Sequence, residues 1–249
     1  MKTLLIACYW WPFNCSGTFR WYKLSYYVEF DVLTSKNPVM TYSDGFKDES
    51  IPVPDVKAYR IGRKWPSALW GLVVSFYVLF FRYELYIFTS PPETLLIGAW
   101  ILEKIFRKKV VVDMRDKIER KLQPLKFMIP VYKFFYRQMN NVTVAWQFID
   151  PNKYLIPHPY DPVSLHPKAL KEPIYYIGRL NFASYHRLLS YGFLQDYSLK
   201  HENYATSSYP TIKKLGFKVN KKMHPEAERE PISWEEAGIL MLDYIKSLK

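Results

Sequence analysis

Polar and charged side chains follow most of the apolar, strand-like runs in this sequence, and their types suit the binding of anions. The first such run leads into Ser16-Gly17-Thr18, with Arg20 one turn into a helix-like segment. A helix N-terminus has free backbone N–H groups and a positive dipole, and a glycine there lets a phosphate approach the backbone closely. We therefore predict a phosphate-binding turn at this point, with a plain helix-capping turn as the alternative.

A second group of charges lies at the end of the run of residues 109–114. Asp113, Arg115 and Asp116 place three charged side chains within four residues. A charge at the end of a buried strand is costly unless it is paired or functional. The sequence therefore allows two interpretations of this group, a ligand site or a structural ion pair.

The remaining strand-like runs add further polar groups. Ser90 and Glu93 follow one run, His158 follows another, and Gly178-Arg179 ends a third. The prolines between Ser90 and Glu93 also fit a simple helix start, which the negative charge of Glu93 favours. Ligands of open parallel sheets bind beyond the carboxyl ends of the strands. The convergence of polar groups at these ends is thus the main argument from the residues for a site.

Strand-like and helix-like segments alternate along the chain, and this order predicts the framework that positions these groups. The strand-like runs are residues 3–9, 30–35, 56–61, 84–90, 109–114, 141–145 and 153–156, and the helix-like segments are residues 18–28, 65–81, 93–106 and 125–139. Such alternation favours an α/β fold, with an open, doubly wound and mostly parallel Rossmann-like sheet that has helices on both faces.

A proline-rich stretch divides the sequence into two unequal parts. We predict an N-terminal Rossmann-like domain over residues 1–157, a linker over residues 158–172 and a small α/β C-terminal domain over residues 173–249. The last domain is short for a complete doubly wound unit. It ends in a helix over residues 233–248, where Ser233 and Glu236 have the spacing of a capping box.

The composition favours an anionic partner. The formal net charge is +12, from 35 basic and 23 acidic residues. Membrane lipid, nucleic acid and phosphorylated ligands all fit such a charge. The longest apolar run, Ala68–Phe81, is shorter than the roughly 20 residues of a membrane-spanning helix. We therefore expect a buried helix or one that lies on a membrane surface, with Arg107-Lys108-Lys109 as a basic cluster that would assist docking.

Cysteine usage and the N-terminal sequence bear on the compartment. Cys8 and Cys15 form neither a metal-ligand pattern nor a disulfide framework. The short apolar run at the N-terminus is followed by loop residues rather than by a cleavage site of the secretory type. We expect a cytoplasmic protein, which is peripheral on the membrane if the aromatic and basic segment of residues 65–82 docks there.

Together, these motifs resemble those of the GT-B glycosyltransferases, and most closely the retaining, nucleotide-sugar-dependent family 4. The matching segments are Ser16-Gly17-Thr18 with Arg20 and Leu24, Ile87–Pro92 with Val110–Asp116, Ile156–Asp161, Tyr175–Leu180 and Ser233–Glu236. The resemblance covers residues 1–180 well and the remainder weakly. It implies a GT-B-like fold with an acceptor-side N-terminal domain and a shortened donor-side C-terminal domain.

The resemblance also implies a reaction. A hexosyltransferase of this type moves a sugar from a nucleotide-sugar donor, here expected to be a UDP- or GDP-sugar, to a glycan, lipid-linked or other hydroxyl acceptor. Retention of configuration is expected, with neither a metal nor another cofactor. Such transfer needs stabilisation of the departing nucleoside diphosphate and of an oxocarbenium-like sugar.

Roles for individual residues follow from the same resemblance. It places Asp116, Arg115 and Asp113 at the catalytic centre, Ser16, Gly17, Thr18, Arg20, Gly178, Arg179, Arg187 and Glu202 at the donor and its phosphates, and Ser90, Glu93 and His158 on the acceptor side. Of the catalytic group, Asp116 is the candidate for the polar catalytic residue.

The C-terminal part departs from the family pattern. Family members have two glutamates that bracket the donor, and the second would fall near Thr211, which is not acidic. The lysine expected a few residues after Gly178-Arg179 is also absent. These departures support an alternative, a non-catalytic nucleotide- or glycan-binding protein with a GT-B-like fold. A nucleic-acid binder is a third interpretation, based on the charge and the aromatic content, although no RNA- or DNA-binding motif accompanies them.

Overall fold

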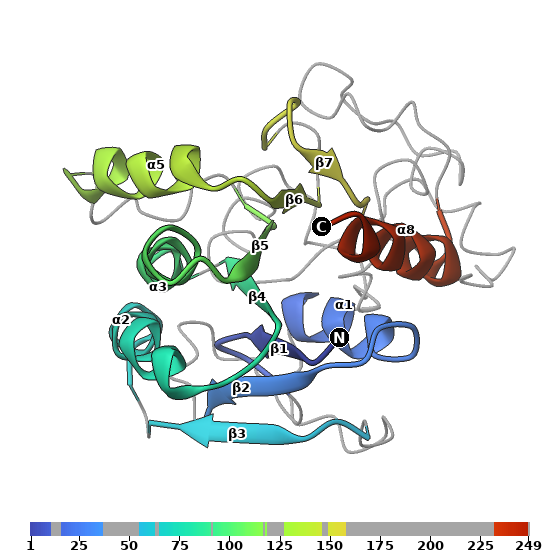
Figure 1. The fold of residues 1–249 in the computed structure, drawn as a ribbon, viewed down its shortest axis with the longest axis horizontal. Helices are drawn as coiled ribbons and strands as arrows, with labels where there is room; N and C mark the ends of the chain where they lie inside the picture. The colour runs from blue at the N-terminus through green and yellow to red at the C-terminus, as the bar shows by residue number, and fades with distance from the viewer. Residues whose placement is uncertain are drawn as a thin grey trace, which may run out of the picture.

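The chain folds around a parallel β-sheet (Figure 1). The structure is a computed structural model that describes residues 1–10, 16–36, 55–62, 65–90, 92–116, 118, 127–145, 149–157 and 232–248. Within these residues the sheet has seven strands in the order β3-β2-β1-β4-β5-β6-β7, and every neighbouring pair runs parallel. The predicted α/β class with an open parallel sheet is confirmed for this part of the chain.

Each strand lies inside an apolar run of the sequence. The strands are β1 Thr3–Ile6, β2 Asp31–Ser35, β3 Ala58–Ile61, β4 Leu85–Ser90, β5 Lys109–Met114, β6 Val142–Val144 and β7 Tyr154–Leu155. Parallel strands covered on both faces read as continuous apolar runs, because side chains on both sides are buried. All six residues of β4 are buried in this way.

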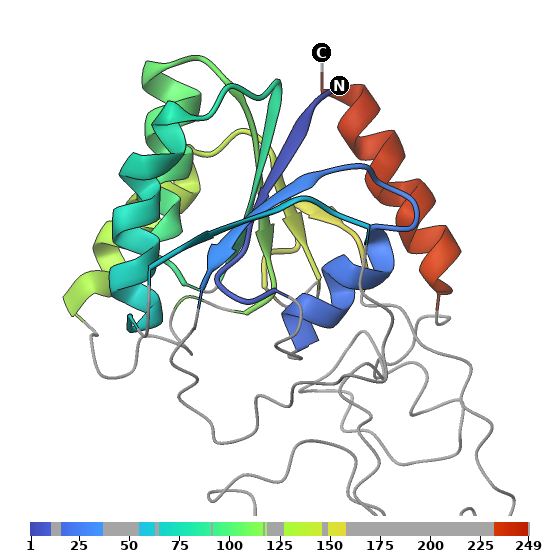
Figure 2. The same cartoon turned by 90° about the horizontal axis from the view of Figure 1, so that it is seen from below.

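Helices cover both faces of the sheet (Figure 2). One face carries α2 Ser67–Tyr77 with the 3-10 turn η1 Val78–Phe80, α3 Leu95–Trp100 with the π-helix η2 Ile101–Ile105, and α5 Ile129–Gln138. The other face carries α1 Ser16–Leu24 and α8 Trp234–Ser247. Successive residues of β1 feed the two cores in turn: Leu4 and Ile6 belong to the first, and Leu5 to the second.

Helix α1 is shorter than the sequence predicts. The apolar pattern extends to Val28, but the helix ends at Leu24. The backbone N–H groups of Tyr27 and Val28 both donate to the Leu24 carbonyl, at 3.0 and 2.9 Å. This turn directs the chain toward β2 and leaves Val28 buried in the second core.

The C-terminal helix packs on the sheet formed by the N-terminal residues. Ala237, Met241 and Ile245 of α8 are buried in the same core as Leu5 and Ile87. Figure 1 shows α8 beside α1 on this face. The helix that the sequence assigns to the C-terminal domain of residues 173–249 thus packs on the Rossmann-like sheet. Residues 158–231, which include the predicted linker and the run that ends at Gly178-Arg179, lie outside the described residues.

The predicted capping box of α8 is confirmed. The Ser233 hydroxyl accepts a hydrogen bond from the Glu236 N–H at 3.1 Å, and the Glu236 carboxylate accepts one from the Ser233 N–H at 2.6 Å. Two N–H groups at the helix start are therefore satisfied by side chains of the same turn. These bonds hold the pKa of Glu236 below its ordinary value of 4.5.

We expect acid to weaken the capping box of α8. Because the folded state lowers the pKa of Glu236, its stabilising contribution is complete above pH 4.5 and is lost as the pH falls through the folded value. Glu236→Gln should therefore show a smaller loss of unfolding free energy on acidification than the wild type, as measured by urea titrations over this range. Glu235→Gln, which removes a charge from the same exposed turn, should keep the wild-type slope; identical slopes for all three proteins would contradict this role.

Candidate functional site

The strand order reverses at β1, which pairs with β2 on one side and with β4 on the other. In open α/β sheets this reversal marks the switch point, where ligands bind beyond the carboxyl ends of the strands. Helix α1 starts at the same edge of the sheet (Figure 2). The structure therefore brings the predicted turn of residues 16–18, the end of β4 and the end of β5 to one edge.

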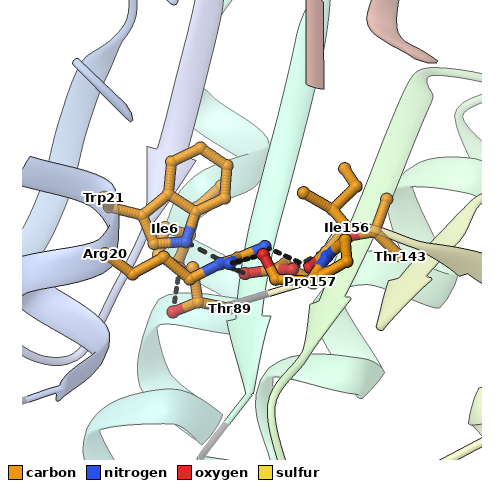
Figure 3. Close-up of polar contacts among 8 residues, drawn as sticks. Ile6, Arg20, Trp21, Thr89, Thr143, Ile156 and Pro157 are labelled. Carbon is orange, nitrogen blue, oxygen red and sulfur yellow. Dashed lines mark hydrogen bonds and ion pairs between the residues drawn. The ribbon is translucent and has the colours of Figure 1, made fainter. Parts of the chain in front are cut away.

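A buried ion pair lies under this edge (Figure 3). Arg20 of α1 and Asp113 of β5 are both fully buried, and the Arg20 Nε lies 3.6 Å from the Asp113 Oδ2. Asp113 also accepts hydrogen bonds from Trp21 Nε1 at 3.1 Å and from Thr143 Oγ1 at 2.9 Å. Because Thr143 is the register partner of Asp113 on β6, one carboxylate joins α1, β5 and β6.

The guanidinium of Arg20 extends this connection to the end of β7. Its Nη2 donates to the Ile156 carbonyl at 3.0 Å, and its Nη1 donates to the Pro157 carbonyl at 3.2 Å. These residues end the N-terminal domain as the sequence predicts it, directly before the predicted linker. Arg20 therefore fixes the position of α1 relative to β5 and to the segment that follows β7.

The electrostatics of Arg20 reflect this burial. Loss of solvent lowers the pKa of the guanidinium, the Asp113 carboxylate opposes the lowering, and the positive charge of Arg115 adds to it. Arg115 is thus close enough for its charge to act on Arg20. The arrangement places two positive groups at the end of β5 against one buried carboxylate.

The structure brings Asp113 and Arg20 together, a contact that the sequence did not indicate. Of the two interpretations of the charged group after β5, an ion pair is what Asp113 forms, and its partner is Arg20 of a distant helix. Both side chains are 0% exposed, so neither presents a polar atom to solvent. In this state they position the edge of the sheet rather than line an open surface.

Other buried polar atoms at the same edge make no hydrogen bond with the described part of the chain. They are the Ser35 Oγ at the end of β2, the Ser90 Oγ at the end of β4 and the Arg115 Nε just after β5. Buried polar atoms are satisfied in the great majority of cases, so unsatisfied ones call for a water, an ion or a ligand. Three such atoms lie at the ends of strands β2, β4 and β5, at the edge of the sheet where the sequence predicts a ligand.

The remaining predicted residues divide between this edge and the part outside the described ranges. Ser16 and Gly17 begin the first turn of α1, and Thr18 in the same turn is buried. Glu93 is buried just before α3, and Asp116 is half-buried beyond β5. The predicted site residues that lie outside the described residues are His158, Gly178, Arg179, Arg187 and Glu202.

Three residues of the site were missed in the sequence. Trp21 and Thr143 satisfy Asp113, and Ser35 ends β2 with an unsatisfied hydroxyl. An aspartate inside the apolar run Val110–Met114 signals that a buried partner must exist, but it does not say which one. Ser35 had a clearer signal, since it ends a strand-like run as Ser90 does.

No group of three or more His, Cys, Asp or Glu side chains that could hold a metal ion occurs among the described residues. No protein-family model matches the sequence, and no curated protein sequence matches it. The class of the protein is therefore defined by its fold: it is an α/β protein with a Rossmann-like, all-parallel sheet in its described part.

Proposed function

We propose that this chain is a metal-independent, retaining glycosyltransferase of the GT-B type that uses a nucleotide-sugar donor. The observation that carries the proposal is the set of unsatisfied polar atoms, Ser35 Oγ, Ser90 Oγ and Arg115 Nε, at the switch-point edge where α1 begins. Two of them, Ser90 and Arg115, lie in the sequence segments that resemble family 4. The proposal joins that resemblance to a site that has the chemistry to hold a phosphorylated ligand.

The start of α1 supports the binding of the donor diphosphate. A nine-residue helix begins at this edge, and its first turn contains Gly17 and lacks an acidic side chain. Backbone N–H groups at such a terminus favour an anion. Since Arg20 is buried against Asp113, we assign it the role of a positioning residue that holds α1 in place, and we leave direct phosphate contact to the α1 backbone and to Arg179 and Arg187.

The end of β5 supplies the catalytic groups in this proposal. Arg115 is half-buried, is close enough to influence Arg20 and has an unsatisfied Nε. Its positive charge would stabilise negative charge that develops on the leaving diphosphate. Asp116, the next residue, is the polar catalytic group that would face the oxocarbenium-like sugar. Ser90 and Glu93 then lie on the acceptor side, at the end of β4.

The proposal predicts that a nucleoside diphosphate or its sugar stabilises the folded protein. At a concentration of about 100 times Kd, one bound ligand adds about 2.7 kcal/mol, which raises Tm by roughly 5–10 °C for a chain of this size. A thermal-shift panel of UDP, GDP, ADP, CMP and their sugars measures this increase. Arg115→Ala should reduce it, whereas Arg82→Ala, an exposed arginine at the other edge, should not. A panel in which no compound raises Tm would contradict the proposal.

A second candidate function, a non-catalytic binding protein, is supported by the missing second glutamate near Thr211 and by the short C-terminal part. It shares the ligand and the site with the first candidate. The two differ in turnover: the binding protein leaves a bound nucleotide-sugar intact, whereas the enzyme releases the nucleoside diphosphate.

A further inference from the structure

Helix α2 lies on the surface of the protein but contains no charged residue. Its sequence from Ser67 to Tyr77 consists of apolar and small residues with two serines and a terminal tyrosine. Leu69, Leu72 and Phe76 are 46%, 39% and 52% exposed, and their spacing places them in one stripe. Phe80, one turn further on, is 83% exposed. A water-facing helix is normally polar on this side.

Helix α5 carries a second apolar stripe. Val131 and Phe134 of α5 are 42% and 54% exposed, and Phe127, which lies two residues before the helix, is 73% exposed. The opposite side of α5 enters the same core as the buried side of α2, through Tyr132 and Trp70 respectively. Figure 2 shows both helices on one face of the sheet, and the exposure of the two stripes places them on the solvent side of this helix layer.

The exposed charged side chains on the described helices of this layer have one sign. The described helices α2, α3, η2 and α5 contain one acidic residue, Glu103, and it is buried. Its carboxylate lies 3.1 Å from Lys104 Nζ and accepts a hydrogen bond from the Asn140 N–H. The exposed charges are basic. They are Arg137 on α5, Arg107 and Lys108 between η2 and β5, and Lys109 at the start of β5.

We propose that this surface docks on an anionic membrane. The docking face consists of Leu69, Leu72, Phe76, Phe80, Phe127, Val131 and Phe134 with the basic residues Arg107, Lys108 and Arg137. Apolar and aromatic side chains enter the boundary between headgroups and acyl chains, and lysine and arginine bind anionic headgroups. No described helix is long and apolar enough to cross a membrane, so the contact would be made from one side.

Charge favours a lipid surface over a second copy of this chain. A symmetric dimer through the docking face would bring like basic residues together, without exposed acidic residues on these helices to pair with them. An anionic bilayer supplies the opposite charge across the whole face. The proposal does not depend on the glycosyltransferase assignment, because it uses none of the residues at the switch-point edge.

Sedimentation with vesicles tests the docking face. Wild-type protein should bind vesicles of equal parts phosphatidylcholine and phosphatidylglycerol and should fail to bind phosphatidylcholine alone. Lys108→Glu with Arg137→Glu, and separately Phe76→Ser with Phe134→Ser, should each lower the bound fraction at least about tenfold at low salt. Ile239→Ser, which changes an exposed apolar residue of α8 on the opposite helix layer, should bind as the wild type does.

Three results would overturn the proposal. They are absence of wild-type binding to the anionic vesicles, equal binding of wild type and both double variants, and a wild-type dimer in sedimentation velocity that Phe76→Ser with Phe134→Ser dissolves. The last result would assign the face to a second copy of the chain. Circular dichroism and Tm of each variant test whether the fold is retained. We expect that it is, because every substituted side chain is at least partly exposed.

Discussion

Asp113→Ala should lower the free energy of unfolding by about 3–5 kcal/mol, because it leaves the Arg20 guanidinium buried without its counter-charge. The change also removes the acceptor for Trp21 and Thr143. Urea denaturation measures the loss. Asp243→Ala, which removes an exposed aspartate from α8, should change the free energy by less than about 0.5 kcal/mol. An Asp113→Ala variant as stable as this control would contradict the network.

A double variant separates the ion pair from the rest of the network. Arg20→Met removes the buried charge, and Asp113→Asn keeps an oxygen that can accept from Thr143 or Trp21. Replacing a buried pair by neutral side chains costs less than breaking it, since no uncompensated charge remains. The combined variant should therefore lose less stability than the sum of the two single changes. Strict additivity would mean that Arg20 and Asp113 do not interact.

The second large effect concerns catalysis. Asp116→Asn should lower the rate of sugar transfer at least tenfold, because it removes the negative charge that would face the oxocarbenium-like sugar in the transition state. Donor binding should change little, so the loss appears in kcat. Asp243→Asn, remote on α8, should have wild-type activity. An Asp116→Asn enzyme with unchanged kcat would show that the catalytic role belongs to another residue.

Local signals account for the parts of the fold that could be predicted. The strand Lys109–Met114 is predicted with its observed bounds, because a run of β-branched residues between a basic start and polar end has few alternatives. The capping box of α8 is equally local: Ser233 and Glu236 are three residues apart, and their bonds close within one turn.

Long-range contacts account for what could not be predicted. The sequence groups α8 with the C-terminal residues, yet Met241 packs in the core with Leu5 of β1. The hydrophobic periodicity of each segment indicates which of its sides is buried, but it does not indicate which other segment packs there. The same holds for Arg20 and Asp113, which are 93 positions apart in the numbering and meet only when α1 crosses the carboxyl end of β5.

The candidate site depends on local signals and on long-range contacts. Ser90 and Arg115 follow strands whose ends can be read from the sequence, and the parallel order of β4 and β5 brings those ends together. The Ser90 Oγ and Arg115 Nε are buried and make no hydrogen bond with the described residues. This depends on how the chain packs, so it could not be predicted from the sequence. The resemblance to family 4 gave Arg20 a place beside the donor phosphates, whereas the structure adds a tie to β5 and β7 that holds the helix in position.

The central claim is that this chain transfers a sugar from a nucleotide-sugar donor. The most direct measurement is release of the nucleoside diphosphate from each UDP- and GDP-sugar by the purified full chain, followed over time with hydroxyl acceptors and with water alone. We predict release from at least one donor by the wild type and at least tenfold slower release by Asp116→Asn. A donor that binds and raises Tm yet stays intact in every reaction would contradict the claim and would leave a nucleotide-sugar-binding protein.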